Sequence, residues 1–387
     1  MELRITQRLT RSISPASYGR ASTRSISAIN LPTNLHEPYV KFDYLSRMNR
    51  IALLLTALLL THFSLSAQSY GKPDHDTTYY HSYKGTIIGR VYLSRNYMQI
   101  RMNPPGSLPT MKYHANTPLS IGLGFTYKFV SFSLSKGLNF LESNATKGAT
   151  HSTDLQLHIY KRKWTLDAIG QFYRGYYLSP HGLASPDGHT YYIRPDVGVQ
   201  LVGVAGYRVM NDERFTYGAG LSQNAWQEKS AGSLLLGGQA FYLALNGDSA
   251  LVPRKVDSVY NEKNIRKLHL LEFGPGIGYA YTFVIQKHYF LLGSLNANID
   301  LYLSQELGSG VRGNKIGFTP NYMLRLGGGY TTNRWGLNLI WIMSNSVADG
   351  KASGYQYAIN TGNYRLVYAR RFAVNRRMKR ILGPDIN

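Results

Sequence analysis

The stretch LSIGLGFTYKFVSFSLS, residues 119–135, decides the fold class of this 387-residue chain. In its first half a small or polar row alternates with an apolar row, Leu119, Ile121, Leu123, Phe125 and Tyr127. Successive side chains of a β-strand point to opposite faces, so this pattern predicts a strand with one apolar face. The phase then reverses, because Val130, Phe132 and Leu134 are the next apolar residues. A reversal without a long insertion predicts a tight hairpin near Lys128 and Phe129.

The same alternation recurs along the chain in about thirteen segments of roughly 10–16 residues. One such row is Phe215, Tyr217, Ala219 and Leu221. Strands of soluble proteins run ~5–6 residues, whereas strands that cross an outer membrane run ~9–11 within the lipid. A soluble sandwich would need a second sheet over each apolar face. In a closed barrel the bilayer covers that face, and closure pairs every backbone group.

We therefore expect an all-β fold, an antiparallel transmembrane β-barrel over residues 86–372. Single-chain bacterial barrels have an even number of strands, so we expect about twelve, with fourteen as the next alternative. Two stretches leave the number open: 86–102 reads as one strand or two, and 246–266 interrupts the alternation. The last strand is expected to end at Phe372, and 373–387 forms a basic C-terminal tail.

The composition agrees with a barrel in a membrane. Charged residues make up 17% of the chain, and there are 38 glycines and 31 tyrosines. Aromatic side chains gather at the two interfaces of a membrane protein. We expect such girdles from strand-end aromatics: Tyr127, Trp164, Tyr207, Tyr281, Tyr330 and Trp335. The glycine runs at Gly274–Gly278 and Gly327–Gly329 lack phosphate-loop spacing, and we expect them to relieve crowding on the concave face.

The stretch MNRIALLLTALLLTHFSLSAQS, residues 48–69, has the form of a secretory signal peptide. A basic Asn49-Arg50 precedes an apolar run of about ten residues, which is too short for a bilayer-spanning helix. Small residues before Gln68 predict cleavage there, which places the mature chain in the cell outer membrane after export. Residues 1–47 are expected to be a non-native leader from an early start codon; their Arg- and Ser-rich composition also fits a transit peptide. Residues 68–85 would form a short periplasmic N-terminal segment.

The net charge of +22 raises the question of nucleic acid. Residues 1–67 hold eight Lys and Arg against three Asp and Glu, so +17 remains after removal of the signal. That remainder is spread over strands and loops. We therefore expect no nucleic-acid partner, and expect outer-membrane lipids and lipopolysaccharide instead, with the barrel-assembly machinery during insertion. The chain has no cysteine, and no motif indicates a cofactor or a metal site.

Charged residues of both signs fall on the predicted inward faces. They are Asp154, His158, Asp167, Glu272, Asp300, Arg325 and Arg365. One hypothesis is a ligand-binding or catalytic cluster, in which Asp154 or Asp167 orients His158 as a general base. The interpretation that we favour is a salt-bridged polar filling that braces a narrow barrel, in which none of these residues is catalytic.

A barrel enzyme acting on lipid acyl chains would need a Ser–His pair near the bilayer surface. Candidates are His151 with Ser152, and Ser230 with His181 or His189. Adjacent residues of a strand point to opposite faces, which argues against the first pair. The turn-rich stretch 176–192 is expected at the cell surface, where it would contact ligands or provide solubility.

Several stretches resemble one known family: IGLGFTYKFVSFSLSKGLNF, STDLQLHIYKRKWTLDAIGQFYRGYYL, and the region from Tyr191 to Leu243. The most specific parts are Arg194-Pro195-Asp196 and QEKSAGSLLLGG at Gln227–Gly238. Over most of residues 80–372 the chain is similar to the domain of unknown function 4421 family, barrel-like exported proteins of Gram-negative, Bacteroidetes-type bacteria. The resemblance implies outer-membrane residence and brings no activity.

From the sequence we expect an integral outer-membrane barrel that binds or passes a ligand through its lumen and surface loops. Two alternatives stay open: a barrel enzyme acting on lipid acyl chains, and a structural or adhesive surface protein.

Overall fold

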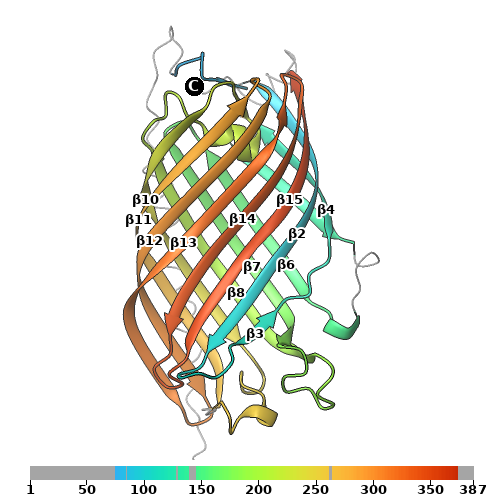
Figure 1. Ribbon diagram of the computed structural model, residues 1–387, viewed down its shortest axis with the longest axis vertical. Helices are drawn as coiled ribbons and strands as arrows, with labels where there is room; N and C mark the ends of the chain where they lie inside the picture. Colours follow the sequence, from blue (N-terminus) through green and yellow to red (C-terminus); the bar gives the residue numbers. More distant parts are fainter. Residues whose placement is uncertain (1–74, 84, 128–129, 139–144, 261–263, 374–387) are drawn as a thin grey trace, which may run out of the picture. The chain divides into compact units, whose positions relative to one another are not determined.

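The computed structural model describes residues 75–83, 85–127, 130–138, 145–260 and 264–373 (Figure 1). They belong to one compact unit, Ser69–Asn387. The predicted leader, the signal peptide and the basic tail from residue 374 lie outside the described residues. No helix in the described ranges is long and apolar enough to cross a bilayer.

Strands dominate the described chain, with three short helical turns (η) between them. In chain order the elements are β1 (Tyr80–Ser82), β2 (Thr86–Asn103), β3 (Met111–His114), β4 (Ser120–Tyr127), β5 (Val130–Gly137), η1 (Ala145–Lys147), β6 (His151–Tyr160), β7 (Trp164–Ser179), β8 (Tyr192–Val209), η2 (Gly218–Ser222), β9 (Ala225–Gln227), β10 (Ala231–Asn246), η3 (Arg254–Val256), β11 (Ile265–Ile285), β12 (Tyr289–Gly308), β13 (Arg312–Thr331), β14 (Trp335–Asp349) and β15 (Gln356–Ala373).

Twelve of the described strands close into an antiparallel ring, in the order β2–β4–β5–β6–β7–β8–β10–β11–β12–β13–β14–β15. The ring closes where β15 pairs with β2 along its whole length, from Gln356 opposite Asn103 to Ala373 opposite Thr86. This confirms the predicted transmembrane barrel, and it shows that residues 86–102 lie in one strand. The short β3 pairs with the far end of β2 and with β7, beyond the end of the shorter strands β4, β5 and β6.

The alternation in the sequence becomes the outside and inside of this ring. Outward side chains are apolar and exposed, as in Ile299 (65%) and Phe318 (74%). Their inward neighbours are buried and polar, such as Asp300 and Thr319. A soluble protein would not leave so large an apolar belt exposed, whereas a bilayer covers it.

The two ends of the ring differ in their connections. At the end that holds Thr86 and Ala373, the connections 161–163, 286–288 and 332–334 are tight and 210–230 is long. The other end carries the longer connections 180–191 and 247–264 and the short 309–311. Gln286 and Lys287 both have a left-handed backbone, as a hairpin turn requires. Barrels of the outer membrane have short periplasmic turns and longer outer loops. Since most tight turns lie at the end that holds Thr86 and Ala373, we use the name periplasmic end for it (top of Figure 1).

The structure corrects two predictions. The row from Phe215 to Leu221 is not a strand: it belongs to the connection 210–230, in which η2 coils inside the periplasmic mouth. All five residues of η2 are buried, so the alternation of apolar and small residues here does not separate a lipid-facing side from a lumen-facing side. A side chain at Gly220 would meet Leu292, so only glycine lets the coil lie against β12. Tyr207 is not a girdle residue either, because its side chain is buried in the lumen.

Other strand-end aromatics do form a girdle. Tyr289, Tyr330, Trp335 and Tyr368 make a continuous row around the periplasmic end, with ring centroids 4.9, 5.3 and 6.3 Å apart along it. Trp335 is 39% exposed, as expected of a ring at the headgroup level.

Candidate functional site

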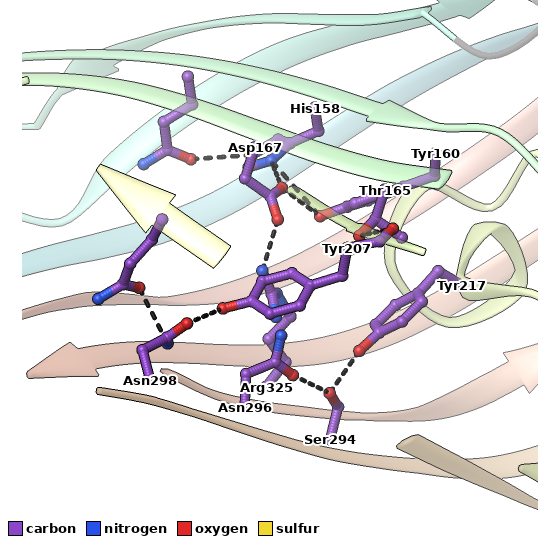
Figure 2. Close-up of polar contacts among 12 residues, drawn as sticks. His158, Tyr160, Thr165, Asp167, Tyr207, Tyr217, Ser294, Asn296, Asn298 and Arg325 are labelled. Atoms are coloured by element: carbon purple, nitrogen blue, oxygen red, sulfur yellow. Dashed lines mark hydrogen bonds and ion pairs between the residues drawn. The ribbon is translucent and has the colours of Figure 1, made fainter. Parts of the chain in front are cut away.

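An ion pair crosses the lumen near its periplasmic end. Arg325 of β13 donates from Nη2 to Asp167 Oδ2 of β7 over 2.5 Å, and both side chains are buried (Figure 2). Strands β8, β10, β11 and β12 separate β7 from β13 along one side of the ring, so the pair connects nearly opposite walls. Separating a buried carboxylate from a buried guanidinium would leave each charge uncompensated and out of water, so the pair holds the two walls together.

Asp167 also orients His158, as one of the two predictions for a general base requires. His158 Nδ1 lies 2.6 Å from Asp167 Oδ1, and the Tyr160 hydroxyl donates to the same oxygen over 2.7 Å. Asp154, the other predicted partner, is engaged elsewhere: it accepts from Asn96, Gln171 and Tyr173.

The other ring nitrogen of His158 has no nucleophile beside it. Its Nε2 lies 3.3 Å from Gln156 Oε1, and among the described residues no serine or threonine hydroxyl is hydrogen-bonded to the ring. A histidine base activates a hydroxyl only within hydrogen-bond reach, so the arrangement holds a histidine in place without completing a catalytic pair.

The Ser–His candidates for lipid hydrolysis are separated in space. Ser230 lies at the periplasmic end, where its Oγ accepts from the Val284 amide over 2.9 Å. His181 and His189 lie in the 180–191 loop at the opposite end. The structure therefore does not bring Ser230 together with either histidine, and the serine has a structural role at the start of β10.

A second layer of the lumen holds two carboxylates among amides and hydroxyls. Asn321 Nδ2 donates to Asp300 Oδ2 over 2.7 Å and to Glu272 Oε2 over 3.1 Å. Gln239 donates to the same Asp300 Oδ2, whose companion Oδ1 is buried without a hydrogen bond, and Ser346 donates to Glu272 Oε2. The predicted filling thus exists. Among the predicted inward charges in the described part of the chain, the ion pairs both involve Asp167, with Arg325 and, when the histidine is protonated, with His158. The carboxylates of the second layer accept from neutral donors. No cluster of three potential metal ligands occurs in the described ranges.

Glycines of β11 make room for this layer. A side chain at Gly276 would lie 1.9 Å from Asn298 Oδ1, and one at Gly274 would meet Asp300. Asn298 in turn accepts from the Tyr207 hydroxyl over 2.8 Å (Figure 2). The glycine run 274–278 therefore lets the polar side chains of β12 lie flat against the wall.

The periplasmic mouth is closed by the connection 210–230. Tyr217, just before η2, bonds Ser294 through its hydroxyl and stacks on Tyr160 with centroids 5.8 Å apart. The N-terminal strand β1 pairs with β9 of the same connection, which covers η2 from outside. The connection 210–230 therefore fills this end of the lumen and is held there by specific contacts.

The outer end is narrowed by the loop 247–264, whose Leu251 and Val252 are buried. Arg194 holds this loop: it donates to the Ala250 carbonyl over 2.8 Å and binds Asp196 through two hydrogen bonds of 2.8 and 2.7 Å. The Arg-Pro-Asp motif that carries the family resemblance thus anchors an outer loop.

Two inward arginines have no such partners. Arg90 of β2 is only 8% exposed, yet its Nε and Nη2 make no hydrogen bond. Arg365 of β15 donates from Nη2 to Gln156 Oε1 over 3.2 Å, while its buried Nε is unpaired. Arg365 is among the inward charges predicted from the sequence, and Arg90 is not. The signal for Arg90 in the sequence is its place in the inward phase with Tyr92.

The closed ring, the apolar outer belt and the polar lumen define an integral outer-membrane β-barrel. The chain belongs to the family described as Domain of unknown function (DUF4421), which matches residues 74–372. Among curated proteins none matches.

Solved barrels resemble the fold distantly. The outer-membrane protease OmpT of Escherichia coli is 8% identical with a TM-score of 0.36, covering 80% of this chain and all of that one. The Ralstonia pickettii toluene transporter TbuX is 11% identical with a TM-score of 0.28, covering 75% of this chain and 90% of that one. The β-domain of the Bordetella autotransporter BrkA is 11% identical with a TM-score of 0.32, covering 74% and 99%. Their activities are not transferred to this chain.

Proposed function

We propose that this protein is a closed outer-membrane barrel that binds a ligand in its lumen and does not act as a permanently open pore. The observation that carries the proposal is the closure of the lumen: η2 fills the periplasmic mouth, and the Asp167–Arg325 pair crosses the space just beyond it. A barrel of this size conducts only when its own side chains leave a path. The unpaired Nε and Nη2 of Arg90 and the unpaired Nε of Arg365 provide binding groups inside such a chamber.

Planar-bilayer recordings test the closure. The intact protein, refolded and inserted, is expected to show no steady current. A variant in which residues 214–224 are replaced by a Gly-Ser linker of equal length is expected to conduct, because Tyr217 and η2 leave the mouth. The matched control shortens the 180–191 loop at the other end, which leaves the plug intact and should stay silent. A steady current through the intact protein would overturn the proposal.

The enzyme alternative is tested separately by lipid turnover. The geometry offers His158 oriented by Asp167, and no serine or threonine hydroxyl of the described residues is hydrogen-bonded to its ring. We expect no hydrolysis of phospholipid or lipopolysaccharide acyl chains by the refolded protein. Turnover that disappears in His158→Ala would instead establish an enzyme.

A further inference from the structure

The wall of the barrel is not continuous between β5 and β6. These two strands share only two paired positions, Val130 opposite Ile159 and Ser131 opposite His158. The neighbouring junctions are complete, since β4 pairs with all of β5 and β7 pairs with all of β6. Within the described residues, 132–137 and 151–157 therefore face each other without a ladder. We call this opening the β5–β6 gap.

The outer lips of the gap lie in the apolar belt. Phe132 and Leu134 on β5 are 65% and 70% exposed, and Leu155 and Leu157 on β6 are 61% and 42% exposed. Unpaired backbone groups are costly in hydrocarbon, so a wall that only has to seal the barrel would be paired here. The inward residues of the same strands, Ser135 and Ser152, are exposed as well, unlike their buried counterparts on the complete strands. The gap thus connects the bilayer with the lumen.

The two arginines lie at the inner mouth of this gap. Gly124 of β4 sits beside Arg90, since a Cβ at this glycine would be 2.9 Å from Arg90 Nε and 3.2 Å from Ser133 Oγ of β5. Arg365 reaches the other lip through Gln156 of β6, and its guanidinium lies 4.8 Å from the Tyr92 ring centroid. The two guanidinium groups therefore lie on the lumen side, beside inward residues of the two strands that border the gap.

Within the described ranges, neither charge is paired directly with a carboxylate. The ion pairs among the described residues include neither Arg90 nor Arg365. Asp154, the acid on β6, already accepts hydrogen bonds from Asn96, Gln171 and Tyr173. Two inward guanidinium groups with unpaired N–H donors are a strong site for an oxyanion, because charge-assisted hydrogen bonds from arginine match carboxylate and phosphate oxygens.

We propose that the β5–β6 gap admits an anionic amphiphile from the bilayer, with its carboxylate or phosphate head bound by Arg90 and Arg365 and its acyl chain lying between β5 and β6. The apolar lips suit the chain, and the cationic inner mouth suits the head. This inference rests on the proposed ligand-binding lumen and names the ligand class and its route, which is lateral and not through the plugged periplasmic mouth or the narrowed outer end.

Equilibrium binding to the full-length mature barrel in nanodiscs tests the head-group site. The probes are a long-chain fatty acid, a monoacyl phosphatidic acid, the fatty alcohol of equal chain length, acetate and inorganic phosphate. We expect both anionic amphiphiles to bind, and Arg90→Gln and Arg365→Gln each to weaken them about ten-fold or more, as the loss of a charged hydrogen bond implies. Arg370→Gln, which removes the same charge from the exposed face of β15, is the matched control and should change nothing.

Binding of the alcohol should be weak and unaffected by these substitutions, and acetate and phosphate should bind far more weakly than the amphiphiles. If the free anions bind as tightly as the amphiphiles, the site takes a soluble ion and the proposal fails. Equal amphiphile binding by the parent protein and by both arginine variants would also overturn it. Arg365→Lys, which keeps the charge, should retain part of the affinity, and heat-modifiable migration verifies that each variant is folded.

The route has its own test, since the chain has no cysteine. Leu134→Cys with Leu155→Cys places thiols on the two outer lips, away from the arginines. Bridging them with a bifunctional thiosulfonate should block loading from the bilayer, and reduction should restore it. Unchanged loading after bridging would refute lateral entry, and cross-linking of Leu134→Cys alone to a second copy would show that the gap is an interface. Neither result would disturb the closed lumen, which falls only if the intact barrel conducts.

Discussion

Removal of one partner of the Asp167–Arg325 pair is expected to destabilise the barrel strongly. Arg325→Met leaves the Asp167 carboxylate buried, with only His158 and Tyr160 as hydrogen-bond partners. Breaking a buried pair from one side typically costs about 3–5 kcal/mol, because the remaining charge stays out of water. Asp167→Asn should cost a similar amount, since it leaves Arg325 buried without its anion.

The double variant Asp167→Asn/Arg325→Met distinguishes the charge interaction across the lumen from the loss of side-chain packing. The double variant contains no uncompensated charge, so it should lose no more free energy of unfolding than either single variant. This corresponds to a coupling energy of about 3 kcal/mol or more. The exposed pair Lys315–Asp349, with N–O 2.9 Å and both side chains 38% exposed, supplies the control. Lys315→Met should cost about 0–1 kcal/mol, as surface pairs do.

Urea titrations of the refolding equilibrium in phospholipid vesicles give these free energies, with heat-modifiable migration as an independent readout. Single variants that lose under about 1 kcal/mol and add up in the double variant would refute the reasoning. The lumen would then be hydrated enough to screen both charges, and the pair would not brace opposite walls.

Three further changes test other parts of the structure. Glu306→Gln should loosen the outer turn 350–355, because the buried carboxylate accepts from the Ala352 and Ser353 amides and the Tyr357 hydroxyl. Trypsin should then cleave faster after Lys351, and unchanged cleavage would contradict this. Gly276→Ala should cost about 1–3 kcal/mol by displacing Asn298, whereas Gly310→Ala, with open space around its Cβ position, should report only its left-handed backbone. Hydrogen bonds from the His189 and Thr190 amides and the Thr190 hydroxyl lower the pKa of Asp187 to about 2. Because this pKa lies below its unfolded value, the turn is stabilised above about pH 4 and loses that support as the pH falls toward 2. A titration of these amide resonances centred near pH 4, or one that persists in Asp187→Asn, would disprove the lowered pKa.

Alternation predicted the ring because each strand separates lipid from lumen, as residues 119–135 do. It failed where that separation is absent. The connection 215–222 alternates like a strand, yet it is buried on all sides, so period two has no physical meaning there. In β8 both phases are apolar, with Leu201 buried and Val202 47% exposed, and the direction of Tyr207 could not be read from such a strand.

The candidate site was only partly predictable for a related reason. Sequence phase identifies inward charges, and Asp167, Arg325, Glu272 and Asp300 all lie in the lumen as expected. Phase does not show which charges meet across the ring, because partners such as Asp167 and Arg325 are 158 residues apart. Nor does it reveal the β5–β6 gap, since both strands alternate normally and only their pairing is missing.

The lumen contacts explain how a barrel can keep such a gap without losing its shape. Asp154 ties β6 to β2 through Asn96, and Gln156 ties β6 to β15 through Arg365, so both contacts pass behind the β4–β5 hairpin. Asp167 then joins β7 to the far wall. The hairpin is held on one side by β2 and on the other by only two paired positions, so it should have the lowest local stability of the ring. A wall element that is free to move, set in a frame that is braced from within, is what lateral entry of a ligand requires.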